Sequence, residues 1–495
     1  MISLVVSGIL ALLFMLWWVK QLRKPRAEKR LPPGPMKLPF IGNLHQLGTL
    51  PHRTLQDLSR KHGALMFLQL GSVPTLVVSS AEMAREIFKN YDSVFSGRPL
   101  LHAANRLGYG SSVSFAPYGE YWREMRRIMI LELLSPRRVQ SFQAVRLEEV
   151  KHLLHSVALS HGSVNLTELV LTLTNNVVCR IALGKRDRGE ADNANKLYEM
   201  LKETQAMLGG FFPVDFFPRL GWLNRFSGLQ HRLEKSFREM DNFYDQVIKD
   251  HVNGSSHKLE TAHEDVVDVL LRVQKDPNQL LAITDDQIKG VLVDIFVAGT
   301  DTASATMIWT MSELIKNPKT MKRAREEIRE VCKGKDIVEE CDLSRLLYLK
   351  SVVKEALRLH PPAPLLIPRE TTQSCTIKGF EIPVKTRVLV NAKSIAVDPN
   401  CWENPTEFFP ERFLDSPIDF KGQHFEMLPF GAGRRGCPGV NFAMPLIELA
   451  LANLLFHFDW DMPLGLGIQD LDMEEAIGIT IHKKAHLRLK ATTFH

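Results

Sequence analysis

The 495-residue sequence has few cysteines, and none of them is spaced as a metal or redox pair. The six cysteines stand at positions 179, 332, 341, 375, 401 and 437, with no C-x-x-C among them. This spacing excludes a zinc ribbon or a thioredoxin-like motif, and the scatter suits a reducing compartment better than a disulfide framework. Internal repeats and low-complexity segments are also missing, and the length is ample for a sizeable core.

Charge is missing from the start of the chain. Residues 1–19 contain no charged side chain, and the run 10–18 is almost uninterrupted by polar residues. Such a run is near the lower limit for a helix that spans a bilayer. Trp17 and Trp18 stand at its end, where interfacial aromatic residues collect. We therefore expect a membrane anchor over residues 1–19.

A basic segment follows the apolar run. Six basic residues and one acid, Glu28, give residues 20–30 a charge of +5 out of the chain's net +6. The remainder is nearly neutral, which gives no support for binding nucleic acid. The positive-inside rule places everything after this segment in the cytoplasm. A cleavable signal peptide is the alternative, but its basic residues would precede the apolar run and a small-residue cleavage site would follow. The prolines of 31–35 stiffen the chain, so residues 20–36 form a basic and Pro-rich hinge.

Periodicity in the rest of the chain predicts a mainly α protein with small β-sheets. Apolar residues recur with the 3.6-residue period of helices at 147–158, 233–252 and 318–331. Short apolar runs around turn residues predict hairpins. We expect strand pairs between 64–70 and 73–79, between 375–377 and 388–390, and within 477–489.

A long central helix is predicted over 285–316. Thr284 and Gln287 form a capping box at its start, and Asn317-Pro318 stops it. At 1.5 Å per residue it is roughly 48 Å long, enough to cross a domain. Its middle reads Ala298-Gly299-Thr300-Asp301-Thr302, in which Gly299 permits a local widening.

The acid and the alcohol in this helix point to proton transfer. Thr302 can hydrogen-bond bound dioxygen, and Asp301 can pass protons inward from water. The alternative is that Thr302 bonds back to the carbonyl four residues earlier while Asp301 is solvated.

The stretch Phe430-Gly431-Ala432-Gly433-Arg434-Arg435-Gly436-Cys437-Pro438-Gly439 is the most informative part of the chain. A cysteine thiolate can hold haem iron, and a glycine-rich loop can turn backbone N–H groups towards the sulfur. A long apolar helix is expected to follow over 442–456. The alternative for Cys437 is a buried structural thiol.

This stretch resembles the haem-binding signature of cytochromes P-450. The resemblance implies the cytochrome P-450 fold preceded by one N-terminal transmembrane helix, with residues 37–495 as the catalytic domain. It implies haem b with Cys437 as the metal ligand. The central-helix motif is also similar to the family's, although Ala303 stands where the family has Thr or Ser. Two further stretches, 115–119 and 215–218, are similar to plant microsomal members of the A-type group.

The resemblance also assigns the remaining site residues. It implies that Asp301 and Thr302 deliver protons and that Glu355, Arg358 and Arg412 form a structural network. It implies that Trp122, Arg126, Arg369 and Arg435 hold the haem propionates, although Trp122 can equally be a core aromatic. The predicted cofactor-binding set is Trp122, Arg126, Ala298, Arg369, Phe430, Arg435, Cys437 and Gly439. A basic patch of Arg123, Arg127 and Arg434 faces a redox partner or is simply solvated.

By the same resemblance, the substrate pocket takes residues from 101–117, 207–222, 291–302, 363–367 and 476–480. Its apolar members are Phe211, Phe212, Phe216, Phe217, Leu365, Leu366, Ile367 and Ile477, although many of them could simply be core. A largely apolar pocket suits a lipophilic small molecule.

The expected activity is that of a monooxygenase in the endoplasmic reticulum membrane. It takes electrons from NADPH–cytochrome reductase and uses O2 to oxidise a terpenoid, alkaloid or phenolic of plant secondary metabolism. The alternatives are a family member that rearranges or dehydrates its substrate without reductase, and a non-enzymatic haem-binding membrane protein.

Overall fold

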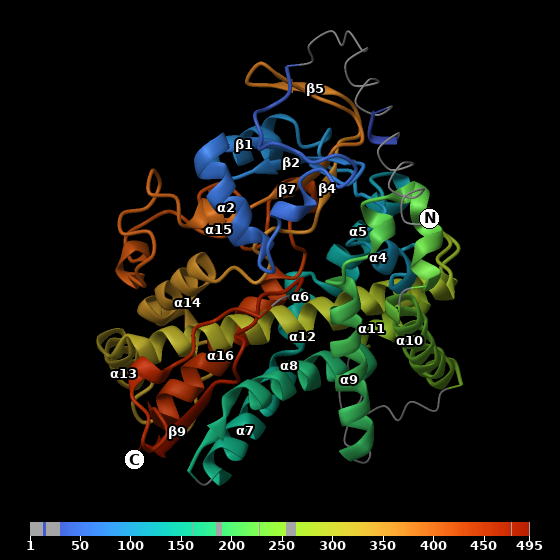
Figure 1. The fold of residues 1–495 in the computed structure, drawn as a ribbon. Helices are drawn as coiled ribbons and strands as arrows, with labels where there is room; N and C mark the ends of the chain where they lie inside the picture. Colours follow the sequence, from blue (N-terminus) through green and yellow to red (C-terminus); the bar gives the residue numbers. More distant parts are fainter. Residues whose placement is uncertain are drawn as a thin grey trace, which may run out of the picture.

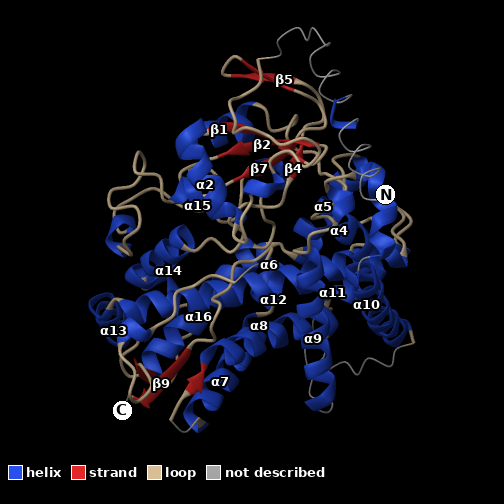
Figure 2. Cartoon of the chain, in the orientation of Figure 1, coloured by secondary structure: helices blue, strands red, loops and turns tan. Residues whose placement is uncertain are grey.

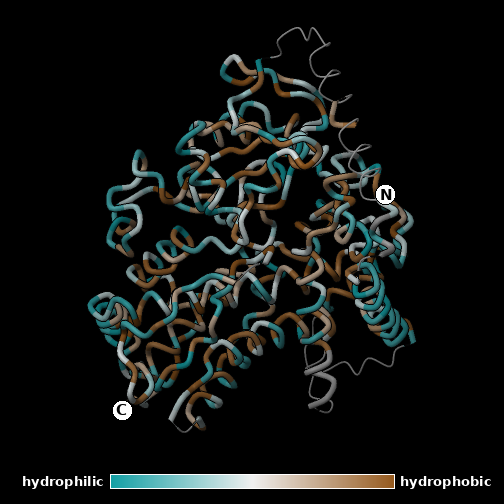
Figure 3. The backbone as a smooth tube through the Cα atoms, viewed as in Figure 1, coloured by the Kyte–Doolittle hydropathy of each residue, from teal (hydrophilic) through white to brown (hydrophobic). Residues whose placement is uncertain are grey.

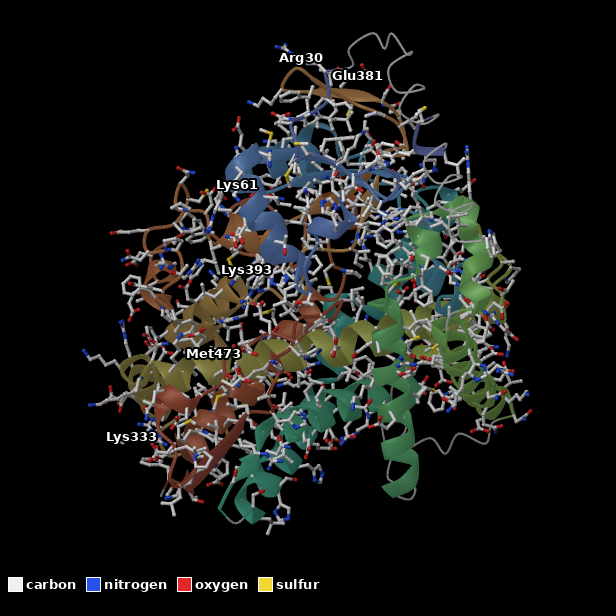
Figure 4. All side chains as sticks on the ribbon, viewed as in Figure 1. Arg30, Lys61, Lys333, Glu381, Lys393 and Met473 are labelled. Atoms are coloured by element: carbon white, nitrogen blue, oxygen red, sulfur yellow. The ribbon has the colours of Figure 1, made fainter. Side chains whose placement is uncertain are left out.

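The computed structural model describes residues 13–15, 30–160, 162–184, 191–226, 228–253, 264–476 and 478–494. The predicted anchor over 1–19 lies outside these residues except for 13–15, and the hinge is described only from residue 30. The proline-rich part of the hinge lies against the sheet, because the Phe67 N–H donates to the Pro33 carbonyl at 2.9 Å. The Glu381 N–H donates to the Arg30 carbonyl at 2.9 Å (Figure 4). The hinge therefore ends docked on the body of the protein.

Helices build most of the described chain, as the sequence predicts, and a central helix crosses the middle of them. This helix, α12 (Asp285–Lys316), begins at the predicted capping box of Thr284 and Gln287 and ends before Asn317. It packs against α8 (Leu166–Leu183) and α16 (Val440–His457). Figure 1 shows α12 passing through the middle of the helical body.

The four other predicted helices are confirmed. α7 (Gln143–Leu159), α10 (Gly228–Val252) and α16 are slightly longer than predicted, and α13 (Pro318–Val331) has the predicted bounds. The further helices are α2 (Pro51–His62), α3 (Ala81–Arg85), α4 (His102–Leu107), α5 (Glu120–Ile128), α6 (Pro136–Ser141), α9 (Ala191–Leu208), α11 (Val266–Lys275), α14 (Leu347–Leu359) and α15 (Ala392–Ala396).

A four-stranded sheet, whose strands are labelled in Figure 2, joins residues 65–78 to residues 369–390. Its strands are β1 (Leu65–Leu70), β2 (Val73–Val78), β7 (Arg387–Val390) and β4 (Arg369–Glu370), in the order β1-β2-β7-β4. The predicted hairpin of β1 and β2 is confirmed. β2 pairs in parallel with β7, which the local pattern of the sequence does not reveal.

The other two predicted strand pairs are wrong in their partners. β5 (Cys375–Ile377) pairs with β6 (Phe380–Ile382) rather than with 388–390, because Lys378 and Gly379, both with positive φ, turn the chain back at once. Within 477–489, the described residues hold the start of one strand, β9 (Arg488–Thr493). This strand pairs with β8 (Phe458–Asp461) and β3 (Val164–Asn165), and both partners lie far away in the sequence.

Three described helices, α8, α12 and α16, are long and apolar enough to cross a membrane by length and composition alone. In α12, 72% of the most apolar window is buried within the protein, as is 56% of the corresponding windows of α8 and α16. Figure 3 shows the contrast with α10, whose residues are largely hydrophilic. The apolar side chains of these three helices therefore pack largely within the protein.

Candidate functional site

One internal cavity brings the predicted cofactor residues together. Trp122, Arg126, Ala298, Arg369, Phe430, Arg435, Cys437 and Gly439 all line it, and so does Thr302. They come from α5, α12, β4 and the loop before α16. Residues that the sequence analysis did not assign also line the cavity, among them Val178 and Ile181 of α8, Phe442 and Ile447 of α16, and Arg98.

The loop that carries Cys437 is closed by backbone contacts. The Cys437 N–H donates to the Phe430 carbonyl at 2.9 Å. Gly433 has a φ of +67°, and a Cβ there would lie 2.5 Å from a carboxylate oxygen of Asp92, so no other residue fits without displacement. After this turn the Gly439 N–H donates to the Cys437 sulfur at 3.4 Å, and α16 begins at Val440.

The surroundings of the sulfur suit a metal-bound thiolate. Cys437 opens into the cavity, and this depth raises the pKa of its thiol, while the Gly439 N–H and the positive charge of Arg126 act in the opposite direction. Arg126 also donates to the Gly436 carbonyl beside the cysteine. Deprotonation of a thiol at such depth needs a cation to compensate the charge, and haem iron is one that thiolates bind.

Four arginines line the cavity. Arg98, Arg369 and Arg435 are buried, and Arg126 is half-buried. Burial and then mutual repulsion lower the pKa of Arg435 to about 9, and burial lowers that of Arg369 to about 10, although Asp92 opposes the shift. Among the described residues, Asp92 is the one carboxylate that forms an ion pair with any of the four, at 3.4 Å from Arg369. The excess positive charge fits a ligand with two carboxylates, as haem has.

Arg98 is a member of this cluster that sequence reasoning missed. Its side chain donates to the carbonyls of Ser114, Ile367 and Pro368 at 2.7 to 2.9 Å. No periodic pattern or motif marks it, because it stands alone between Gly97 and Pro99.

Trp122 makes a different contact from the one expected. Its indole N–H donates to the Val113 carbonyl at 3.0 Å. The guanidinium of Arg435 lies 4.1 Å above the centre of its ring, a cation–π arrangement that orients the arginine. In the structure, the ring of Trp122 supports Arg435, while its indole N–H is bound to the Val113 carbonyl.

Thr302 and Asp301 point in different directions from α12. Thr302 lines the cavity, and its hydroxyl donates to the Ala298 carbonyl at 2.8 Å, which is the back-bonding alternative. Asp301 is buried, and its Oδ1 lies 2.6 Å from Nε2 of His482. No local motif marks His482, whose segment follows α12 by more than a hundred residues.

The expected widening of α12 at Gly299 is wrong. The helix continues as regular α-helix through this residue. A Cβ on Gly299 would lie 3.1 Å from Cγ2 of Val178. The glycine therefore allows α8 to approach α12 closely.

The predicted structural network is assembled away from the cavity. Two nitrogens of Arg358 donate to the two oxygens of Glu355 at 2.7 and 2.8 Å, and Nε of Arg412 donates to the same carboxylate at 3.1 Å. The side chains of Glu355 and Arg358 are fully buried.

Only part of the predicted substrate pocket lines the cavity. Val113, Ser114, Ile295, Ala363, Leu366 and Ile367 do so, whereas Phe211, Phe212, Phe216, Phe217 and Leu365 do not, and Ile477 lies outside the described residues. The loop with the phenylalanines docks elsewhere, because the Phe216 carbonyl accepts from the N–H of Ser72 in the β1–β2 turn at 2.8 Å. The expectation for these phenylalanines and for Leu365 is therefore wrong in this structure.

The expected basic patch is partly neutralised. Arg127 forms an ion pair with Glu124, and Arg434 lies 3.5 Å from Asp92.

Comparisons with known proteins agree with this site. The family model of cytochrome P450 matches residues 32–488. The chain is 81% identical to cytochrome P450 71A9 of Glycine max, over the whole of both chains. It is 54% identical to strychnine-11-hydroxylase of Strychnos nux-vomica, over 96% of this chain and 93% of that protein. It is 45% identical to desmethyl-deoxy-podophyllotoxin synthase of Sinopodophyllum hexandrum, over 98% of this chain and 96% of that protein.

Proposed function

Because the chain belongs to the cytochrome P450 family, we propose that it is a haem-thiolate monooxygenase of plant secondary metabolism. It takes electrons that originate from NADPH, uses O2, and oxidises a lipophilic small molecule. The observation that carries this proposal is the cavity that is lined by Cys437 and by four arginines, three of them buried.

The residues of this cavity divide the work of holding haem b. Cys437 would ligate the iron through its sulfur, and the Gly439 N–H and Arg126 would stabilise the negative charge of the thiolate. Arg98, Arg126, Arg369 and Arg435 would pair with the two propionates, and Trp122 would fix the position of Arg435. Ala298, Phe430 and Gly439 would contact the ring. Bound there, haem supplies the reductive activation of O2 and the oxidation of the substrate.

The protein's own part in proton delivery runs through the middle of α12. Thr302 directs its hydroxyl oxygen to the cavity, where it accepts or passes a proton. Asp301 holds protons behind it, and His482, whose side chain is one-third exposed, connects the buried carboxylate with water. The hydrogen bond from Thr302 to Ala298 leaves the lone pairs of the hydroxyl available.

The substrate is a terpenoid, alkaloid or phenolic. The apolar side chains around the cavity, such as Ile295, Leu366 and Ile447, favour such a compound. Two relatives, named strychnine-11-hydroxylase and desmethyl-deoxy-podophyllotoxin synthase, support a substrate of plant secondary metabolism.

The location of the enzyme is part of the proposal. Residues 1–19 anchor it as a single span in the endoplasmic reticulum membrane, residues 20–36 form the hinge, and residues 37–495 form a cytoplasmic catalytic domain. There it receives electrons from NADPH–cytochrome reductase. The uncharged run 1–19 and the basic residues behind it support this orientation.

Reconstitution with the reductase tests the function. The purified protein is combined with NADPH–cytochrome reductase and a panel of plant terpenoids, alkaloids and phenolics, first screened by the shift that they cause in the haem absorption spectrum. We expect at least one compound to gain an oxygen atom, labelled when 18O2 is used, and only with NADPH and reductase present. Full turnover without NADPH would favour the rearranging alternative. A haem-loaded protein that oxidises none of the compounds it binds would favour the non-enzymatic one.

A further inference from the structure

Asp294 is a buried acid in the wall of the cavity that the proton path does not use. It stands one helical turn before Ala298 on α12 and so shares its face, and it lines the cavity. Burial raises the pKa of this carboxyl, while hydrogen bonds from residues 112–114 act against the shift. A carboxylate in such a place is costly unless it is bound by several donors. The groups that donate hydrogen bonds to Asp294 therefore indicate its role.

The donors all belong to the segment 112–116, which follows α4. The Ser112 hydroxyl donates to Oδ1 of Asp294 at 2.7 Å, and the Val113 N–H donates to Oδ2 at 2.6 Å. The Ser114 N–H donates to Oδ2 at 3.4 Å. Both oxygens of one side chain thus fasten this segment to the central helix.

The opposite side of the same segment is fastened to the arginine cluster. The Val113 carbonyl accepts from the indole of Trp122 at 3.0 Å and from Arg435 at 3.3 Å. The carbonyls of Ser114 and Ala116 accept from Arg98 at 2.9 Å and from Arg435 at 2.7 Å. Val113 and Ser114 also line the cavity. The segment therefore lies between Asp294 and the groups proposed to hold the propionates.

The charges fit the same arrangement. The negative charge of Asp294 acts on Arg98, where it opposes the effects of burial and of the three neighbouring arginines. Asp92, which also lies 3.5 Å from Arg434, and Asp294 leave these guanidinium charges in excess. The two propionates of haem would supply further negative charge.

We propose that Asp294 is a positioning residue for both the cofactor and the substrate. By holding segment 112–116 on α12, it fixes Arg98 and Arg435 in the direction of the propionates and keeps Val113 and Ser114 in place in the cavity wall. The inference rests on the proposed function, because it takes haem as the occupant of the cavity.

The variant Asp294→Asn tests the proposal. An amide has one acceptor oxygen in place of two and turns N–H groups towards the N–H groups of the segment. In the purified holoenzyme without substrate, we expect the amides of 112–116 to exchange with deuterium about tenfold faster or more. The reduction potential of the haem moves upward, because a negative charge beside the arginines has been removed.

Two further variants separate this role from a general loss of structure. Ser112→Ala removes one donor and keeps the carboxylate, so it speeds exchange to a smaller degree and leaves the reduction potential unchanged. Asp286→Asn makes the same charge change at an exposed position of the same helix and alters neither quantity. If Asp294→Asn does not fold, unchanged exchange in Ser112→Ala overturns the proposal.

The proposal is overturned if the amides of 112–116 in Asp294→Asn exchange at the rate of the unaltered protein and the haem keeps the same reduction potential. This result stays distinct from failure of the proposed function, because the measurements need bound haem but no turnover. A protein that bound no haem would be recognised first in its absorption spectrum.

Discussion

Nε2 of His482 and Oδ1 of Asp301 lie 2.6 Å apart and join the C-terminal segment to the central helix. The backbone beside His482 is held on both sides, since the Ile481 N–H donates to the Pro362 carbonyl at 2.8 Å and the Ile481 carbonyl accepts from the indole of Trp309 at 3.0 Å. The carboxylate is almost fully buried, whereas the imidazole reaches solvent. His482 is therefore the described side chain that links Asp301 to water.

Removal of either partner should impair proton delivery. We expect Asp301→Asn to lower the rate of product formation by roughly 100-fold, because the amide cannot carry a proton as an acid does. His482→Gln should have a smaller effect in the same direction, with less product per NADPH consumed and a larger solvent isotope effect. His486→Gln, at an exposed position of the same segment, is the control. Unchanged coupling in His482→Gln would mean that protons reach Asp301 by another route.

The thiolate ligand gives the sharpest spectroscopic prediction. Cys437→Ser should abolish product formation, and the reduced, carbon monoxide-treated protein should lack the long-wavelength Soret band, because an alcohol does not donate electron density to iron as a thiolate does. Cys401→Ser, at an exposed position, should leave band and activity intact. A normal band in Cys437→Ser would refute the assignment of the ligand.

The buried network should be sensitive to loss of its acid. Glu355→Gln leaves the charges of Arg358 and Arg412 without a carboxylate, and breaking a buried ion pair in this way costs about 3–5 kcal/mol. The expected result is a large fall in the midpoint of chemical unfolding and in the yield of haem-loaded protein. The matched control is Glu326→Gln, whose pair with Lys322 is exposed and is worth less than about 0.5 kcal/mol. Equal stability of the two variants would contradict a supporting role for the network.

The stability of the fold at acid pH should depend on Glu475. Burial acts to raise the pKa of this carboxyl, but hydrogen bonds and charge from His52 and Arg53 outweigh it and lower the pKa to about 2, from a usual 4.5. A pKa that is lower in the folded state stabilises the protein above pH 4.5, and the contribution is lost as the pH falls towards 2.

Unfolding measured over this range should show the difference between wild type and Glu475→Gln. The variant should be less stable than wild type near neutral pH. The difference between their free energies of unfolding should become smaller as the pH is lowered. Glu474→Gln, at the neighbouring and exposed position, should run parallel to wild type. If this difference in free energy stayed constant with pH, the contacts of Glu475 with His52 and Arg53 would not depend on ionisation of the carboxyl.

The membrane anchor is tested by truncation. Deletion of residues 1–19 should move the protein from the membrane pellet to the soluble fraction, because the apolar run is the segment expected to enter the bilayer. The folded body should still bind haem. A truncated protein that stays in the membrane through washing with alkali would place the attachment on another surface.

Sequence reasoning succeeded where the signal is local. The capping box of Thr284 and Gln287, the turn at Gly71-Ser72 and the start of α13 at Pro318 each depend on residues a few positions apart. The cysteine loop was found for the same reason, since the residues of its signature lie within ten positions of one another.

Contacts between distant segments account for the rest. β9 pairs with β8 and β3, and Asp301 contacts His482. These contacts depend on packing between distant segments, which the local periodicity of the sequence does not predict. Arg98 carries no motif of its own. The phenylalanines of 211–217 were placed in the pocket by resemblance of their segment to the family, and their apolar character did not separate a pocket from a core.

The parallel pairing of β2 with β7 has a consequence for biosynthesis. During translation, one edge of β2 stays without its partner strand until β7 has been synthesised, and most of the helices precede β7 in the sequence. An unpaired strand edge invites association with other chains, and parallel pairings over such separations form slowly. The nascent polypeptide should therefore need chaperone protection over this interval, and Cys437, which follows β7, is translated later still.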